Sequence, residues 1–473
     1  MLKIAKAKAA AKLFSGYILL AALFIAAAAS PSLQKEVPAE EIMSKVKAGM
    51  NATYDNISVV GDIDLRDLEA EESLKITNSH LAGVNLEGSS FAESVDFSGS
   101  TFSSDADFSR AKVSSYAGFE GASFEKNASF AETEFPESDF TDASLLGYSD
   151  FTSAVFGDYA SFNGAQLSNA TFNESQFESV ADFCYSQFDK RGEFFKAAFS
   201  DVALFKNVEF KEGGRFDLAS FSDIAAFTSA EFGSRAVFIS ARFRAPTHFG
   251  TVNFSADAIF QLAQFDNLAH FIGSNFSGNL NLMSSKIANI KLENTTFTKD
   301  AQILLKDSDF NKFQTHWNHI KNNLAYDGAA YLKLVKNYKD LEWFSDSDDC
   351  YYQYRTESQN MKSWGLSKIS DMLACLSCGY GVRPFNPVYC SLALIVVCTG
   401  ILWRGNGLRS PAHMEKSTVM LDALYYCLAV FFTIPLPDLK PQGRFRYVAV
   451  FERAIAWTLF ALMIATMGKV MIR

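Results

Sequence analysis

The chain contains little cysteine, histidine or proline for its length. Its 473 residues include 7 Cys, 6 His and 10 Pro, and the cysteines are unevenly spread. So few cysteines exclude a disulfide-dense scaffold, and the scattered histidines form no cluster that predicts a metal site. Charged residues make up 20% and hydrophobic residues 48% of the chain, a balance that excludes a disordered protein.

The net charge of −10 is divided unequally along the chain. Residues 31–310 carry a formal charge of −20, and the remaining residues together carry +10. The acidic middle argues against nucleic-acid binding, and the basic, apolar ends suggest contact with membrane lipid. No nucleophile, general base or metal-ligand cluster has a usable spacing, so we expect no catalytic residue, no cofactor, no metal and no enzymatic activity.

The first 30 residues have the pattern of a targeting segment. Several lysines within the first twelve residues precede an apolar run over 17–29, and small residues then lead to Pro31. This order predicts a secretory signal peptide, with an uncleaved N-terminal anchor as the alternative, since the run is short for a full span. In both cases the residues after position 31 lie outside the cytoplasm.

Phenylalanine is abundant, with 45 residues, and it is periodic. Steps of five and six residues alternate, so the true period is eleven, and small residues often stand two positions earlier. The longest unbroken run is Phe183, Phe188, Phe194, Phe199, Phe205, Phe210, Phe216, Phe221, Phe227, Phe232, Phe238, Phe243, Phe249, Phe254, Phe260, Phe265, Phe271 and Phe276. Neither an α-helix nor a single strand has this period. The pattern predicts a solenoid with one short straight edge per unit and the large residue pointing inward.

Individual repeats read ADFSR at 106–110, ASFEK at 122–126 and AVFIS at 236–240. The repeat over 81–310 resembles the pentapeptide-repeat family, whose motif is a small residue, a polar residue, Leu or Phe, and two variable residues. The resemblance implies a right-handed quadrilateral β-helix of about ten coils with about 22 residues each. Residues 31–80 are expected to form a lead-in and an N-terminal coil. No partner of the solenoid is predicted.

The repeat is interrupted in two places, and each interruption predicts a local structure. Leu145 and Leu146 compete for one inward place, which predicts a bulge within 140–151. Over 311–364 the repeat stops and helical spacing begins. Because the last coil of a solenoid leaves a sheet edge and an apolar floor bare, these residues are predicted to form a helical hairpin that caps it.

Residues 365–386 are predicted to form an amphipathic segment at the membrane interface. Cys375 and Cys378 form a lone C-x-x-C there, which we interpret as two small apolar residues rather than a zinc or redox pair. Residues 387–403 and 448–468 are apolar runs that predict two membrane spans. The protein is therefore expected to be a multi-pass protein of the cell membrane, mainly β with an α-helical membrane part.

The segment between the two spans is the most informative one. A short apolar helix over 421–432 is followed by Thr433, Ile434, Pro435, Leu436, Pro437 and Asp438. The order of outer helix, short helix, T-x-P-L-P-D and final helix over 387–473 resembles the pore module of two-span potassium channels, whose filter reads T-x-G-Y-G-D.

This resemblance assigns roles to individual positions. Thr433 matches the filter threonine, Leu436 falls at the tyrosine, and Asp438 matches the closing aspartate. Pro435 and Pro437 replace the two glycines, whose left-handed backbone a proline locked near −65° cannot adopt. The filter is therefore predicted not to select potassium. Glu452 is the polar residue of the inner helix, expected to lie near the membrane interface, to pair within the bundle or to tune the constriction.

Two membrane orientations remain open. Residues 404–447 carry six basic residues and the C-terminal tail only two, so the positive-inside rule places this loop inside and the β-helix outside the cell. The competing topology is that of the potassium channels, with the filter outside, and it requires that residues 1–30 are not an export signal.

Two functions follow from this reading. The first is a cation channel, a homo-oligomer and a tetramer if channel-like, that conducts monovalent cations through 433–438. The alternative is a membrane-anchored surface β-helix with an interaction role and a non-conducting pore relic.

Overall fold

The computed structural model describes residues 34–409, 419–435 and 439–471. The predicted signal peptide or anchor over 1–30 lies outside these residues. The chain divides into two compact units. The first contains the residues up to Leu280 together with Asn294–Thr298, and the second contains Asn281–Glu293 and Lys299–Arg473.

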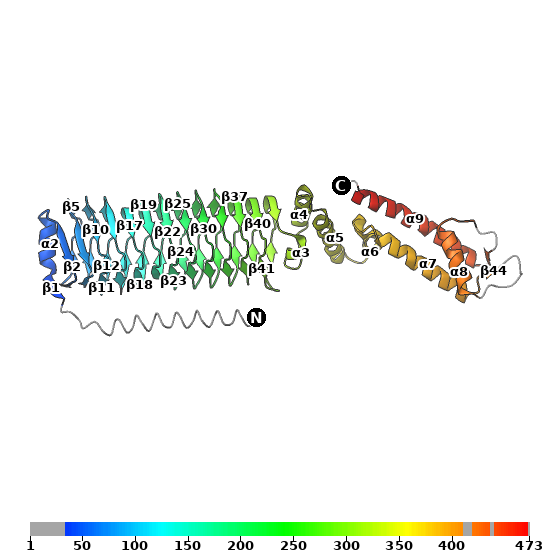
Figure 1. The fold of residues 1–473 in the computed structure, drawn as a ribbon, viewed down its shortest axis with the longest axis horizontal. Helices are drawn as coiled ribbons and strands as arrows, with labels where there is room; N and C mark the ends of the chain where they lie inside the picture. The colour runs from blue at the N-terminus through cyan, green and yellow to red at the C-terminus, as the bar shows by residue number, and fades with distance from the viewer. Residues whose placement is uncertain (1–33, 410–418, 436–438, 472–473) are drawn as a thin grey trace. The chain divides into compact units, whose positions relative to one another are not determined.

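The first unit is a β-solenoid built from very short parallel strands (Figure 1). A typical coil contains β11 (Thr101–Phe102), β12 (Ala106–Asp107), β13 (Lys112–Val113) and β14 (Tyr116–Gly118). Each strand pairs with its equivalent one coil later, so that Phe102 is opposite Phe124. Four strands per coil agree with the predicted four-sided coil.

Phenylalanine fills the core as predicted. Phe194, Phe216 and Phe238 are fully buried, and their rings stack on each other with centroids 4.8 Å apart at each step. This distance is the spacing of neighbouring strands, so the backbone pairing and the ring stack share one repeat. Buried alanines such as Ala197 and Ala219 lie between the rings of successive faces.

The alternation of five and six residues has a backbone cause. In each five-residue step, the second residue after the phenylalanine has a positive φ, for example 57° at Lys196, 55° at Asn207, 58° at Leu218 and 58° at Ser229. These left-handed residues recur every eleven positions. The sequence does not reveal them, because glycine or asparagine, which tolerate this conformation best, occupies only some of the positions.

The solenoid extends over residues 35–314 and has about 13 turns. It is longer than the predicted ten coils over 81–310, because the early coils bury aliphatic residues such as Ile57, Ile63 and Leu74 in place of phenylalanine. The expected lead-in therefore consists of coils, preceded by β1 (Lys35–Pro38) and α2 (Ala39–Lys47).

The predicted bulge is confirmed. In β18 (Ser144–Asp150), Leu145 is fully buried, whereas Leu146 is 48% exposed. The register with β20 (Gln166–Thr171) shifts between Leu145 and Tyr148. The extra residue thus turns Leu146 outward, which leaves one leucine in the core.

The second unit opens with the end of the coil pattern, where β40 (Lys286–Lys291) pairs in parallel with β43 (Asp309–Gln314). The predicted helical cap follows as α3 (Trp317–Ile320), α4 (Gly328–Asp340) and α5 (Phe344–Met361). Asp327 caps α4 by accepting a hydrogen bond from the Ala330 N–H at 2.9 Å. The large rings of Trp317, Tyr331 and Tyr338 are buried among these helices.

The predicted interfacial segment is α6 (Leu366–Cys378), followed by the short 3-10 helix η1 (Gly379–Gly381). Asp371 of α6 pairs with Lys362 and, at 3.1 Å, with Arg355 of α5. The hydrogen bond from Lys362 is the main cause that lowers the pKa of Asp371. Arg383 also pairs with Asp349 of α5 at 2.7 Å, so charged contacts join the cap to this segment.

Candidate pore module

The last part of the second unit contains two long apolar helices. Helix α7 (Asn386–Arg404) begins with Pro387 in its first turn, and α9 (Phe445–Met471) is the final helix. Both are long and apolar enough to cross a membrane. They agree with the two predicted spans.

The chain that leaves the C-terminal end of α7 comes back to the same place before it enters α9. Gly405 and Gly407 follow α7, and a Cβ atom at Gly407 would come within 2.7 Å of the Phe445 ring. The strand β44 (Leu408–Arg409) pairs antiparallel with β45 (Lys440–Pro441). The C-terminal end of α7 and the N-terminal end of α9 are therefore neighbours, and we call the connection between these two helices the pore loop.

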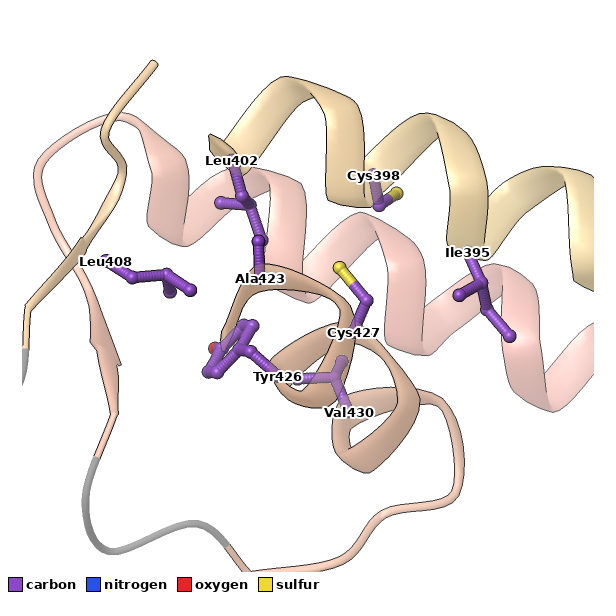
Figure 2. Close-up of a cluster of buried hydrophobic side chains, with 8 residues drawn as sticks. All are labelled: Ile395, Cys398, Leu402, Leu408, Ala423, Tyr426, Cys427 and Val430. Atoms are coloured by element: carbon purple, nitrogen blue, oxygen red, sulfur yellow. The ribbon is translucent and has the colours of Figure 1, made fainter. Parts of the chain in front are cut away.

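The loop contains the predicted short helix, α8 (Met420–Phe431). Its buried residues Ala423, Tyr426, Cys427 and Val430 form one cluster with Ile395, Cys398 and Leu402 of α7 and with Leu408 (Figure 2). As Figure 2 shows, Ala423 lies near Leu402 and Cys427 lies near Cys398, so α8 runs back along α7 toward its middle. Helix α8 therefore enters the layer that the two long helices span.

Helix α8 ends in a tight left-handed turn. The Ile434 N–H donates to the Ala429 carbonyl at 2.8 Å, and the Thr433 N–H donates to the Val430 carbonyl at 3.2 Å. This is a Schellman motif, in which the left-handed position usually belongs to glycine. Thr433 occupies it with φ 56°, a rare conformation for a β-branched residue that costs about 1–3 kcal/mol.

The turn lies against the middle of α9. Phe431, Phe432 and Thr433 line a cavity of about 180 Å³ together with Ala456, Trp457 and Phe460. Ala456 is roughly 17 Å along the helix from the start of α9, whereas the hydrocarbon core of a bilayer is about 30 Å thick. The chain therefore reverses at about half the depth of the spanning layer.

Only part of the predicted filter segment falls within the described residues. Thr433, Ile434 and Pro435 follow α8 directly, and all three are exposed, Ile434 by 55%. Leu436, Pro437 and Asp438 lie outside the described residues.

Glu452 is buried, whereas Thr433 in the turn is exposed. Glu452 lies on the face of α9 that also buries Ala456 and Leu459. The next residue, Arg453, is exposed and lines a separate groove with Tyr426 and Trp457. The sequence singled out Glu452 by its charge, but the side of the helix on which it lies depends on packing.

The C-x-x-C residues lie outside the pore loop. The Cys375 thiol is 3.5 Å from the Tyr352 hydroxyl of α5, and Cys378 is buried at the end of α6. Within the described ranges, no three His, Cys, Asp or Glu side chains gather as a metal site would require.

Residues 378–473 match the family model described as ion channel. The chain joins a β-solenoid to a two-span channel module. No curated protein and no solved structure matches the chain. The match covers α7, α8 and α9, the three helices whose order in the sequence resembles a pore module. It therefore supports a membrane location for this part of the chain.

Proposed function

We propose that the channel module forms the subunit of an oligomeric, cation-conducting pore whose constriction is built by residues 433–438. The observation that supports this proposal is the left-handed turn at Thr433, roughly halfway along α9, with Thr433, Ile434 and Pro435 exposed and non-helical. Backbone without helical hydrogen bonds is tolerated at this depth only where protein covers it or water reaches it. In an oligomer arranged around a water-filled axis, neighbouring subunits would cover part of this backbone and water in the axis would reach the rest.

The direction of α8 favours cations. Its C-terminal end points into the spanning layer, and the end of a helix with unpaired carbonyl groups carries a partial negative charge. The carbonyls of Ala429 and Val430 are used by the Schellman turn, but the dipole of the whole helix still points to the same place. A cation at the turn is therefore stabilised, and an anion is repelled.

The two prolines argue against a potassium-type filter. Pro435 and Pro437 lack an N–H and cannot adopt the left-handed backbone that lines carbonyl oxygens along an axis. We therefore propose a pore that discriminates weakly among monovalent cations. Of the two orientations, the excess of basic residues in 404–447 supports the one with the solenoid outside the cell.

The alternative, a surface β-helix whose pore does not conduct, is favoured by the same prolines. Cation flux into liposomes that contain the full-length protein separates the two functions. The pore proposal expects flux from the natural protein, with similar rates for sodium and potassium. Verified insertion and oligomerisation without flux would support the anchor function.

The double variant Pro435→Gly/Pro437→Gly reports on the filter itself. If the scaffold of the pore is intact, this variant conducts at least as well as the natural protein, because glycine permits the backbone that proline forbids. Val396→Ala is the control and should leave the flux unchanged, since Val396 is a 68% exposed residue of α7 that lies outside the proposed constriction over 433–438. Flux that appears only in the glycine variant would mean that the prolines close the pore.

A further inference from the structure

The most unusual buried group of the channel module is the carboxyl group of Glu452. The residue has no exposed surface. Among the residues that the structure describes, neither Oε1 nor Oε2 has a hydrogen-bond partner. The hydroxyl oxygen of Thr399, also buried on α7, likewise lacks a partner within those residues.

These groups meet where three helices pack together. Cys398 of α7 and Cys427 of α8 both lie within electrostatic range of the Glu452 carboxyl group, and Thr399 of α7 lies beside Cys427. Within the described part of the chain, no hydrogen bond of ordinary geometry reaches the Glu452 carboxyl oxygens or the Thr399 hydroxyl. Figure 2 shows the thiols of Cys398 and Cys427 in the layer between α7 and α8. Tyr426 of α8 is also within electrostatic range of Glu452.

No positive charge in the described part of the chain pairs with this carboxyl group. Arg453 is next in sequence, but it is exposed and lies on another side of α9. An ionised carboxylate, buried without an ion pair or hydrogen-bond donors, costs several kcal/mol or more, and such groups bind a proton instead. A neutral carboxyl group also brings an O–H donor to a cluster of one hydroxyl and two thiols.

We infer that Glu452 is a positioning residue that holds the pore helix α8 against α7 and α9 in its neutral, protonated form. This inference rests on the proposed function, because α8 carries the turn at Thr433. Its effect on ions is indirect: Glu452 lies behind the pore helix and sets where the helix ends. Ionisation of Glu452 would require α8 to move away so that water could reach the carboxylate.

The linkage has a definite sign. In the packed state Glu452 binds a proton, and in an opened state, in which water solvates it, the proton is released at neutral pH. The opened state binds fewer protons, so the free energy of opening falls as pH rises, and the opening constant grows up to about tenfold per pH unit.

Alkylation of Cys427 in the full-length protein, mapped by mass spectrometry of its peptide, measures this opening without any need for conduction. Cys427 is fully buried, so the reagent reaches it only when α8 moves. The half-buried Cys390 of the same molecules is the reference for the pH dependence of thiol chemistry. Between pH 5 and pH 7, the ratio of Cys427 to Cys390 alkylation is expected to rise, by up to about tenfold per pH unit while packed Glu452 keeps its proton.

Glu452→Gln retains the shape of the side chain and cannot ionise, so its ratio of Cys427 to Cys390 alkylation is expected not to change with pH. Arg453→Gln, the control, should show the same pH dependence of this ratio as the natural protein. A natural ratio that does not rise, or a Glu452→Gln variant that follows the natural profile, would overturn the inference. Infrared detection of an ionised Glu452 carboxylate at pH 5, identified by its loss in Glu452→Gln, would also overturn it. Absence of flux would refute the proposed function and leave these outcomes unchanged.

Discussion

Asn337 pairs with Phe313 through both atoms of its side-chain amide. The Phe313 N–H donates to Oδ1 of Asn337 at 2.9 Å, and Nδ2 donates to the Phe313 carbonyl at 2.9 Å. The side chain thus supplies to β43 the two hydrogen bonds that a further strand would supply. Asn337 is buried in α4, so the cap covers the sheet edge with a specific pairing as well as with apolar rings.

Replacing this side chain should loosen the end of the solenoid. Asn337→Leu keeps a similar volume but leaves one buried donor and one buried acceptor of Phe313 unpaired, at a cost of about 1–3 kcal/mol for each group. Hydrogen exchange of the Phe313 amide is expected to accelerate strongly. Asn311→Leu, an exposed change on the same strand, should leave that exchange rate unchanged, and equal rates in the two variants would refute the role of Asn337.

Replacing one of the recurring positive-φ residues of the solenoid by glycine should stabilise the protein. Leu218 is 50% exposed and has φ 58°, a conformation that costs a side-chain-bearing residue about 1–2 kcal/mol. Glycine removes this cost but loses about 0.5–1 kcal/mol to the flexibility of the unfolded chain. Leu218→Gly should therefore raise the free energy of unfolding by about 0.5–1 kcal/mol.

The matched control for this change is Ser220→Gly, two residues away in the extended strand β29 (Ser220–Phe221). There glycine brings only the entropic loss and should destabilise. Urea unfolding, followed by circular dichroism, measures both variants. If both glycines lowered stability equally, the corner at Leu218 would not be strained.

Asp189 is expected to stabilise the folded solenoid at neutral pH and to lose this stabilising effect in acid. It accepts hydrogen bonds from Lys211 at 2.6 Å, Gln187 at 2.8 Å and Ser168 at 2.9 Å. The bond from Lys211 is the main cause that lowers the pKa of Asp189 to about 2. The unfolded chain, with the ordinary pKa of about 4, then binds more protons, so this stabilisation exists above pH 4 and disappears as pH falls through about 2.

Unfolding midpoints at pH 7, pH 4 and pH 2.5 measure this contribution. Asp189→Asn should be less stable than the natural protein at pH 7, and the difference between them should shrink at pH 2.5. The exposed Asp158→Asn serves as the comparison and should follow the natural protein at every pH. A constant difference between Asp189→Asn and the natural protein would contradict the assignment.

The solenoid could be predicted from sequence because one residue type repeats in one role. Each buried phenylalanine sits at the same place in its coil, so a period of eleven is visible without any structure. The corner geometry could not be predicted, because residues as different as Lys196, Leu218 and Ser229 adopt the same left-handed conformation. There the pairing of neighbouring coils overrides the preference of the individual residue.

For the channel module too, the order of the elements could be predicted from the sequence but their packing could not. The order of two apolar spans around a short helix and Thr433 was visible in the sequence, and the family match supports it. The depth of the turn follows from the packing of Phe432 and Thr433 on α9. The burial of Glu452 depends on which face of α9 meets α7 and α8, and the nearly continuous apolar sequence of α9 does not mark that face.

If the turn at Thr433 lines an ion path, chemical modification of position 433 must change the flux. Sodium flux is measured in liposomes that carry the Thr433→Cys variant, before and after a charged, membrane-impermeant thiol reagent. The reagent is expected to reduce the flux in Thr433→Cys. It should leave the flux unchanged in the natural protein and in Leu421→Cys, at the opposite end of α8. Complete modification of Cys at 433 with undiminished flux, or no flux from the natural protein, would contradict an ion path lined by this turn.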